Sequence, residues 1–155
     1  MSYANRGKNL EELISYINDY YKQRNIALLH KVPTEWSYAN GRYFPKRKSI
    51  VDFLGIAKGK PIAFDTKECS NTSNFPIANI HNHQMEYLRQ FATLGGLAFY
   101  LIHLKKASKI FILTQYQLDQ FIKQNTRKSI PFHCFWQNCK EVDYLRVDYL
   151  SCLEV

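Results

Sequence analysis

Two β-prone runs joined by a very short basic turn constrain the fold of this chain most. Residues 49–56 and 61–68 are both strand-like, and the turn between them is centred on Lys58-Gly59-Lys60. A connection this short joins two antiparallel strands that hydrogen-bond to each other. Any fold of this chain should therefore contain a β-hairpin across residues 49–68.

Asp52, Asp65 and Lys67 of this hairpin form a candidate catalytic cluster. Asp52 lies seven residues before Gly59 and Asp65 six residues after it, so pairing brings them roughly opposite each other. Asp65 and Lys67 are two residues apart and share one face of their strand. Neighbouring carboxylates repel unless a cation lies between them, and hard oxygen ligands favour Mg²⁺, for which Mn²⁺ can substitute. Asp52 and Asp65 are therefore predicted metal ligands, with Lys67 placed to hold or deprotonate a water.

Helical and strand-like patterns alternate along the rest of the chain. An apolar stripe at helical spacing predicts a helix over residues 10–21, with Asn9 as its N-cap. Further helices are expected over 81–94 and 116–124, and further strands over 26–31, 97–104 and 109–114. Residues after 126 show no clear pattern. The order predicts an α/β fold in a single domain, 1–155, with a mixed central β-sheet flanked by helices.

The charge of the chain favours a polyanionic partner. The chain has 155 residues and a formal net charge of +8, as is common for proteins that bind nucleic acid. A basic protein without such a partner is the alternative interpretation of charge alone. No apolar run is long enough for a membrane span, and residues 1–12 show no secretory signal. The four cysteines contain no Cys-x-x-Cys pair, so a reduced, cytoplasmic location is expected.

Residues 33–48 combine aromatic and cationic side chains around an Asn40-Gly41 turn, which predicts a second, projecting hairpin or short stalk. Aromatic rings can stack on unpaired bases, and cations can contact phosphates. An equally supported alternative is that Tyr43 and Phe44 anchor this hairpin to the core or to a dimer partner. The DNA-binding candidates are Arg6, Lys8, Trp36, Tyr38, Arg42, Lys46, Arg47 and His83.

His81-Asn82-His83 spells the letters of the HNH nuclease motif, but that motif needs its residues far apart. Both histidines are expected on the helix over 81–94, where they should point about 200° apart and could not share a metal. We expect His83 on the helix surface, facing DNA or capping the helix.

Several sequence blocks that occur in order make the chain resemble a known nuclease family. They are YANRG, LEELISYINDYY, HKVPT, YFPKR, KGKPIAFDTKE and FPIANIHNHQMEYL followed by GG. Together with an Asp followed by (Asp/Glu)-x-Lys on a hairpin, these blocks resemble the RecU-type Holliday junction resolvases of the PD-(D/E)xK nuclease superfamily. The resemblance implies a restriction-endonuclease-like core and a metal-dependent endonuclease. A homodimer is implied to resolve four-way DNA junctions by paired symmetric nicks.

The resemblance also extends the candidate site beyond the hairpin. It implies a catalytic role for Gln84, and it implies Glu11 as a further carboxylate at the metal. Glu11 is preferred to Glu12 because Gly7 and Glu11 match the Gly-x-x-x-Glu pattern of related archaeal resolvases. Asp65 departs from the usual Glu of the family, and the segment before the first catalytic Asp is shorter than the stalk of bacterial RecU.

Two other functions are compatible with these residues. One is a different PD-(D/E)xK nuclease that acts on duplex DNA in repair or restriction. The other, less favoured, is a non-catalytic DNA-binding protein that retains the fold. The intact Asp52, Asp65 and Lys67 argue against the second.

Overall fold

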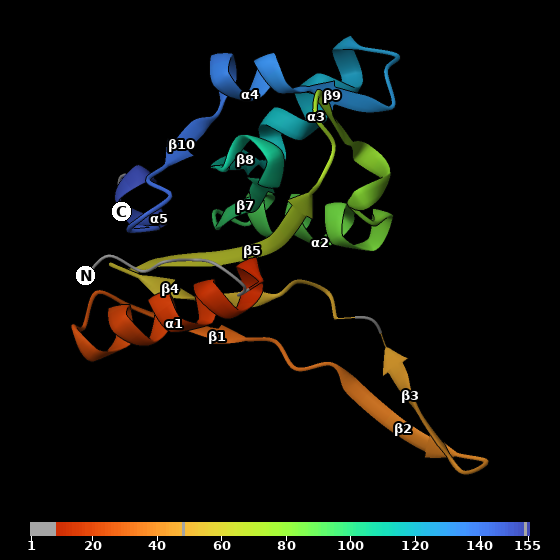
Figure 1. Ribbon diagram of the computed structural model, residues 1–155. Helices are drawn as coiled ribbons and strands as arrows, with labels where there is room; N and C mark the ends of the chain where they lie inside the picture. The colour runs from red at the N-terminus through yellow and green to blue at the C-terminus, as the bar shows by residue number, and fades with distance from the viewer. Residues whose placement is uncertain (1–8, 48, 154) are drawn as a thin grey trace.

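A computed structural model describes residues 9–47, 49–153 and 155 of the chain (Figure 1). The helices are α1 (Leu10–Gln23), α2 (Asn82–Thr93), α3 (Gln115–Gln124), α4 (Phe132–Asn138) and α5 (Tyr149–Cys152), with 3₁₀ turns η1 (Ile77–Asn79) and η2 (Lys105–Ala107). The strands are β1 (Ala27–Lys31), β2 (Glu35–Ala39), β3 (Arg42–Arg47), β4 (Phe53–Ala57), β5 (Lys60–Cys69), β6 (Asn74–Pro76), β7 (Leu97–Leu104), β8 (Lys109–Thr114), β9 (Ser129–Pro131) and β10 (Lys140–Val142). Within the described ranges, no helix is long and apolar enough to cross a membrane.

The central sheet has six strands in the order β1-β4-β5-β7-β8-β10. The β5–β7 pair is parallel and the other pairs are antiparallel. Parallel neighbours need a crossover connection, and here the chain crosses through β6, η1 and α2. β5 therefore lies in the middle of the sheet, between its hairpin partner and the strand that follows α2.

The two faces of the sheet bury different clusters, with α1 on one face and α2 and α3 on the other (Figure 1). On the α1 face, the ring of Phe64 stacks between Phe53 and Phe99 at centroid distances of 5.0 and 4.9 Å. Side chains alternate along β5, so Ala63 and Asp65 face the opposite side, towards α2. The chain thereby places a polar residue of its central strand on the α2 face.

The structure confirms the predicted mixed-sheet fold and corrects one strand boundary. The predicted first helix is α1, and Asn9 Oδ1 caps it by accepting from the Glu12 N–H at 2.8 Å. The strand expected from residue 49 begins at Phe53 instead. Just before it, the carboxylate of Asp52 accepts the backbone N–H of Thr66, where a regular ladder would use backbone acceptors. The prediction of a strand over residues 49–52 was therefore wrong.

The second hairpin, β2–β3, extends away from the body of the molecule (Figure 1). Its turn residues Asn40 and Gly41 have φ angles of 52° and 74°, the left-handed conformation that a two-residue hairpin turn requires. The register pairs Tyr38 with Tyr43 and Trp36 with Pro45. These side chains therefore share one face of the hairpin.

Candidate active site

The β4–β5 hairpin brings Asp52 and Asp65 together, as the residue count predicted. The ladder pairs Phe53 with Phe64, so Asp52 and Asp65 form the next opposed pair outward. Lys67 lies two residues further along β5 and contacts the same carboxylate, with its Nζ 2.6 Å from Asp65 Oδ2. The three residues singled out in the sequence are therefore neighbours in space.

Asp65 is a fully buried carboxylate, with 0% of its surface exposed. Gln84 Nε2 donates a hydrogen bond to Oδ1 at 2.8 Å, and Lys67 lies against Oδ2. Burial is the main cause that raises the pKa of Asp65 to about 7; the neighbouring Asp52 carboxylate adds to the shift and Lys67 opposes it. The site therefore concentrates negative charge where water solvates it poorly.

Asp52 is held by the residue that separates Asp65 from Lys67. The Thr66 N–H and the Thr66 hydroxyl both donate to Asp52 Oδ2, at 2.7 and 2.6 Å. From the sequence, Thr66 looks like an ordinary strand residue, and this use of its hydroxyl was not predicted. The signal is absent because the bond depends on where β4 begins.

Gln84 reaches Asp65 from the first turn of α2. Its Oε1 accepts the backbone N–H of His81 at 3.3 Å, while its Nε2 donates to Asp65. The helix start therefore orients the Gln84 amide so that its donor side faces the buried carboxylate.

Glu11 lies on α1 and forms an ion pair with Lys31 of β1, at 2.9 Å between Nζ and Oε1. Glu11 chiefly, and Asp52 more weakly, raise the pKa of Lys31. Within the described part of the chain, no three or more His, Cys, Asp and Glu side chains are grouped as metal ligands. Among the described residues, Glu11 is therefore not grouped with Asp52 and Asp65 as a ligand set, and its partner is Lys31, a residue that the sequence did not single out.

The residues present fit a divalent cation. Asp52 and Asp65 offer carboxylate oxygens, the hard ligands that Mg²⁺ prefers. The carboxylate of Asp65 is buried beside a second carboxylate, a combination that a cation stabilises. Asp52 and Asp65 would hold the ion, with Lys67 beside them.

His81 and His83 do not lie on opposite sides of a helix, so that prediction was wrong. Their rings stack at 5.6 Å with an interplanar angle of 9°. The reason is that His81 is the N-cap of α2 and has an extended backbone, so helical spacing does not apply to it. His83 is exposed, and its Nε2 lies 3.4 Å from the Ser49 carbonyl oxygen, which fits the expected position on the helix surface.

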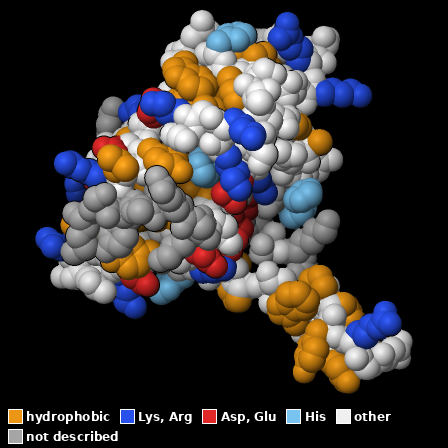
Figure 2. Space-filling view, viewed as in Figure 1, with side chains coloured by type: hydrophobic (Ala, Val, Ile, Leu, Met, Phe, Trp, Pro, Cys, Tyr) orange, Lys and Arg blue, Asp and Glu red, His pale blue; other side chains and the backbone are white. Residues whose placement is uncertain are grey.

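The projecting hairpin carries the exposed aromatic candidates. Trp36, Tyr38, Tyr43 and Phe44 are all exposed, and the rings of Tyr38 and Tyr43 lie 4.9 Å apart. In Figure 2, acidic side chains gather near the middle of the visible face with lysine and arginine side chains around them, and the hairpin extends from the body. Arg6 and Lys8 lie outside the described residues, as do the side chains of Lys46 and Arg47.

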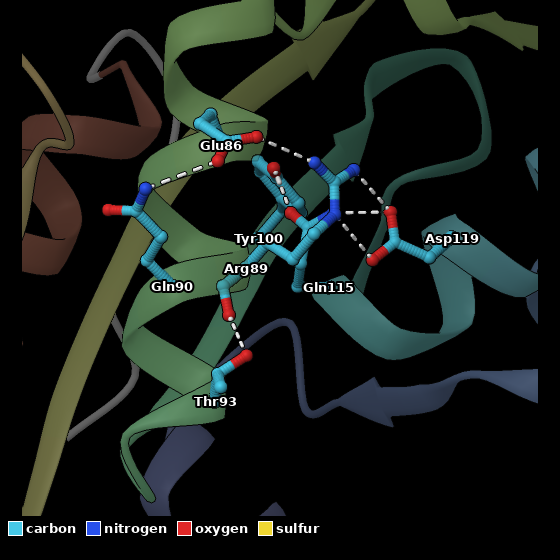
Figure 3. A network of polar contacts seen from close by, with 7 residues as sticks. All are labelled: Glu86, Arg89, Gln90, Thr93, Tyr100, Gln115 and Asp119. Carbon is cyan, nitrogen blue, oxygen red and sulfur yellow. Dashed lines mark hydrogen bonds and ion pairs between the residues drawn. The ribbon is translucent and has the colours of Figure 1, made fainter.

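A polar network fastens α2, the helix of Gln84, to α3 and β7 (Figure 3). Arg89 donates through Nη2 and Nε to the two carboxylate oxygens of Asp119, at 2.7 and 3.1 Å. Asp119 also accepts from Gln115 at 2.9 Å, and Gln115 accepts the buried hydroxyl of Tyr100 at 2.6 Å. Tyr100 pairs with Asp65 in the parallel register. The network therefore connects the helix behind Gln84 to the strand beside Asp65.

Comparison with known proteins agrees with this geometry. A profile of the RecU family, described as Recombination protein U, matches residues 5–155. The chain belongs to the RecU family. The resemblance seen in the sequence blocks is thereby confirmed.

Individual relatives cover almost the whole chain. One RecU relative, from Pediococcus pentosaceus, is 36% identical over 92% of this chain and 78% of its own length. Another, from Bacillus cytotoxicus, is 32% identical over 99% of this chain and 86% of its own length. Both are named Holliday junction resolvase RecU.

A solved structure shares the fold of this RecU family member. Hjc of Archaeoglobus fulgidus, a Holliday junction resolvase, superposes with a TM-score of 0.50 at 15% identity. The match covers 83% of this chain and 94% of Hjc. It supports the restriction-endonuclease-like core predicted from the sequence.

Proposed function

We propose that this RecU family member is a metal-dependent endonuclease that resolves four-way DNA junctions by paired symmetric nicks. The observation that carries the proposal is the buried Asp65 carboxylate, which lies opposite Asp52 and beside Lys67. Its relatives are named as Holliday junction resolvases, which supports the same substrate.

Each side chain of the candidate site has a separate role in the proposed reaction. Bound Mg²⁺, or Mn²⁺ in its place, supplies Lewis acidity at a phosphate oxygen and acidifies a water. Asp52 and Asp65 hold the ion, and Lys67 Nζ holds the attacking water and stabilises the charge that develops on the phosphate. Gln84 keeps the Asp65 carboxylate in place, and Glu11, proposed as a further carboxylate near the metal, pairs with Lys31.

The proposed DNA contacts are made by the β2–β3 hairpin and by positively charged side chains. The aromatic face of β2–β3 stacks on bases that are unpaired at the branch point, and Arg42 contacts phosphate. His83, exposed in the first turn of α2 next to Gln84, adds a further contact. Arg6, Lys8, Lys46 and Arg47 complete the proposed phosphate contacts.

Two matched nicks in a junction with near two-fold symmetry call for two active sites. We propose that residues 1–155 act as one nuclease domain and that two chains form a C2 homodimer with one site each. The four cysteines are free thiols, which is in keeping with the proposed cytoplasmic location.

Asp65→Asn tests the proposal, because it keeps the shape of the side chain but removes a ligand charge. Junction binding should persist, while Mg²⁺-dependent nicking falls by at least about a thousandfold, since several kcal/mol of transition-state stabilisation is lost. The assay compares a four-way junction with a linear duplex of the same sequences. Equal cutting of both by the wild type would favour a duplex nuclease, and undiminished cleavage by Asp65→Asn would show that the site is misassigned.

A further inference from the structure

Thr66 makes an unusual pair of contacts for a strand residue. It donates its backbone N–H and its side-chain hydroxyl to the same oxygen, Oδ2 of Asp52. Asp52 lies just outside β4, so no regular strand pairing holds its side chain. Two donors aimed at one oxygen fix the rotation of this carboxylate and define which oxygen remains for other partners.

The backbone bond alone would satisfy the end of the ladder. The Thr66 N–H needs an acceptor where the β4–β5 pairing stops, and Asp52 Oδ2 provides one. The hydroxyl bond at 2.6 Å is additional, and any strand-forming residue without a hydroxyl would leave the ladder equally complete. Hydrogen bonds to a carboxylate are about twice as strong as those between neutral groups. The hydroxyl therefore restrains Asp52 beyond what the fold needs.

We propose that Thr66 is a positioning residue, which orients the Asp52 carboxylate to bind the divalent cation together with Asp65. This inference rests on the proposed function, because it assigns Asp52 as a ligand. Residues that hydrogen-bond to a metal ligand pre-orient it, and their loss weakens metal binding. Thr66 is half-buried, so its hydroxyl bond is partly shielded from water.

The test compares Thr66→Val with Thr66→Ser in the full chain. Valine has the shape and strand preference of threonine but lacks the hydroxyl, whereas serine keeps the hydroxyl and loses the methyl group. Thr93→Val is the matched control, because the exposed Thr93 hydroxyl donates to the Arg89 carbonyl oxygen in the last turn of α2, at the other end of the helix from Gln84. Mn²⁺ binding without DNA is measured from the electron paramagnetic resonance signal of the free ion.

We expect Thr66→Val to weaken Mn²⁺ binding about 10- to 100-fold, as is usual for loss of a ligand's hydrogen-bond partner. Thr66→Ser and Thr93→Val should bind Mn²⁺ nearly as tightly as the wild type. In junction cleavage, Thr66→Val should need more Mg²⁺ for half-maximal rate and regain much of its rate when Mg²⁺ is saturating. Thermal unfolding in EDTA confirms that each variant is folded.

Two results would overturn the positioning role. One is wild-type Mn²⁺ affinity in Thr66→Val, and the other is an equal loss in Thr66→Ser, which would trace the effect to the methyl group. A wild-type protein that neither binds Mn²⁺ nor nicks junctions would instead overturn the proposed function, so the two failures are distinguishable.

Discussion

At Asp65, burial disfavours the charged carboxylate, whereas the proposed role as a metal ligand requires that charge. The carboxyl group has an ordinary pKa of 3.8 and a pKa of about 7 in the folded, metal-free chain. The folded state therefore binds this proton more tightly than the unfolded state. Its contribution to stability is complete below the unfolded pKa and is lost as the pH rises through the folded pKa.

Asp65→Asn should remove this pH dependence, because the amide does not titrate. In EDTA, we expect the variant to gain stability relative to the wild type between about pH 5 and about pH 8, by about 2–3 kcal/mol. Thermal unfolding at a series of pH values measures the difference. Parallel curves for the two proteins would contradict the shifted pKa of Asp65.

The two hairpins differ in how firmly the rest of the molecule holds their strands. β4 and β5 each pair with a strand on both sides, so the candidate groups on β5 and just before β4 are rigidly placed. β2 and β3 form a two-stranded sheet of their own, which is marginal in water. Its Trp36 and Tyr43 are 62% and 76% exposed, so this face is available for contact with DNA.

Replacing Trp36, Tyr38 and Tyr43 together by Ala should weaken junction binding by at least about 100-fold, since each base stack is worth about 1–3 kcal/mol. The melting temperature should hardly change, because the three rings lie outside the buried core clusters. Fluorescence anisotropy with a labelled junction measures the binding. Ser37→Ala on the other face of the hairpin is the control, and an equal loss there would argue against a specific aromatic face.

The ion pair between Arg89 and Asp119 joins α2 to α3 at a partly exposed position. Arg89→Gln should lower the free energy of unfolding by no more than about 1 kcal/mol, as is usual for exposed ion pairs. Glu86→Gln is the control, because Glu86 is a second, more exposed partner of Arg89 and should matter less. Urea unfolding measures both. A much larger loss in Arg89→Gln would show that the network supports the fold itself.

The whole molecule should function as a pair of chains. Light scattering is expected to give twice the chain mass of 18.3 kDa. When wild-type and Asp65→Asn chains are co-expressed, mixed dimers should nick one strand of a junction but fail to nick both. Paired nicking should thus fall more steeply with the share of inactive chains than single nicking. If paired nicking and single nicking both fell in simple proportion to the share of inactive chains, that result would contradict the dimer.

Local sequence patterns were sufficient for most of the longer elements before residue 126 and for the central pair of the site. Helical periodicity located α1, short-turn residues located both hairpins, and counting outward from Gly59 placed Asp52 opposite Asp65. These features depend on residues close together in the chain, so spacing alone specifies them. The elements after residue 126 are too short to show a helical or strand-like period along the chain.

Tertiary structure decided how the site is held. The Thr66 hydroxyl reaches Asp52 because β4 begins one residue later, and Lys31 meets Glu11 because α1 packs against β1. The stacked rings of His81 and His83 likewise follow from where α2 starts. Such contacts depend on strand ends and helix packing, which spacing along the chain does not encode. The sequence by itself thus determined which groups are proposed to carry the chemistry, and the fold decided which neighbours orient them.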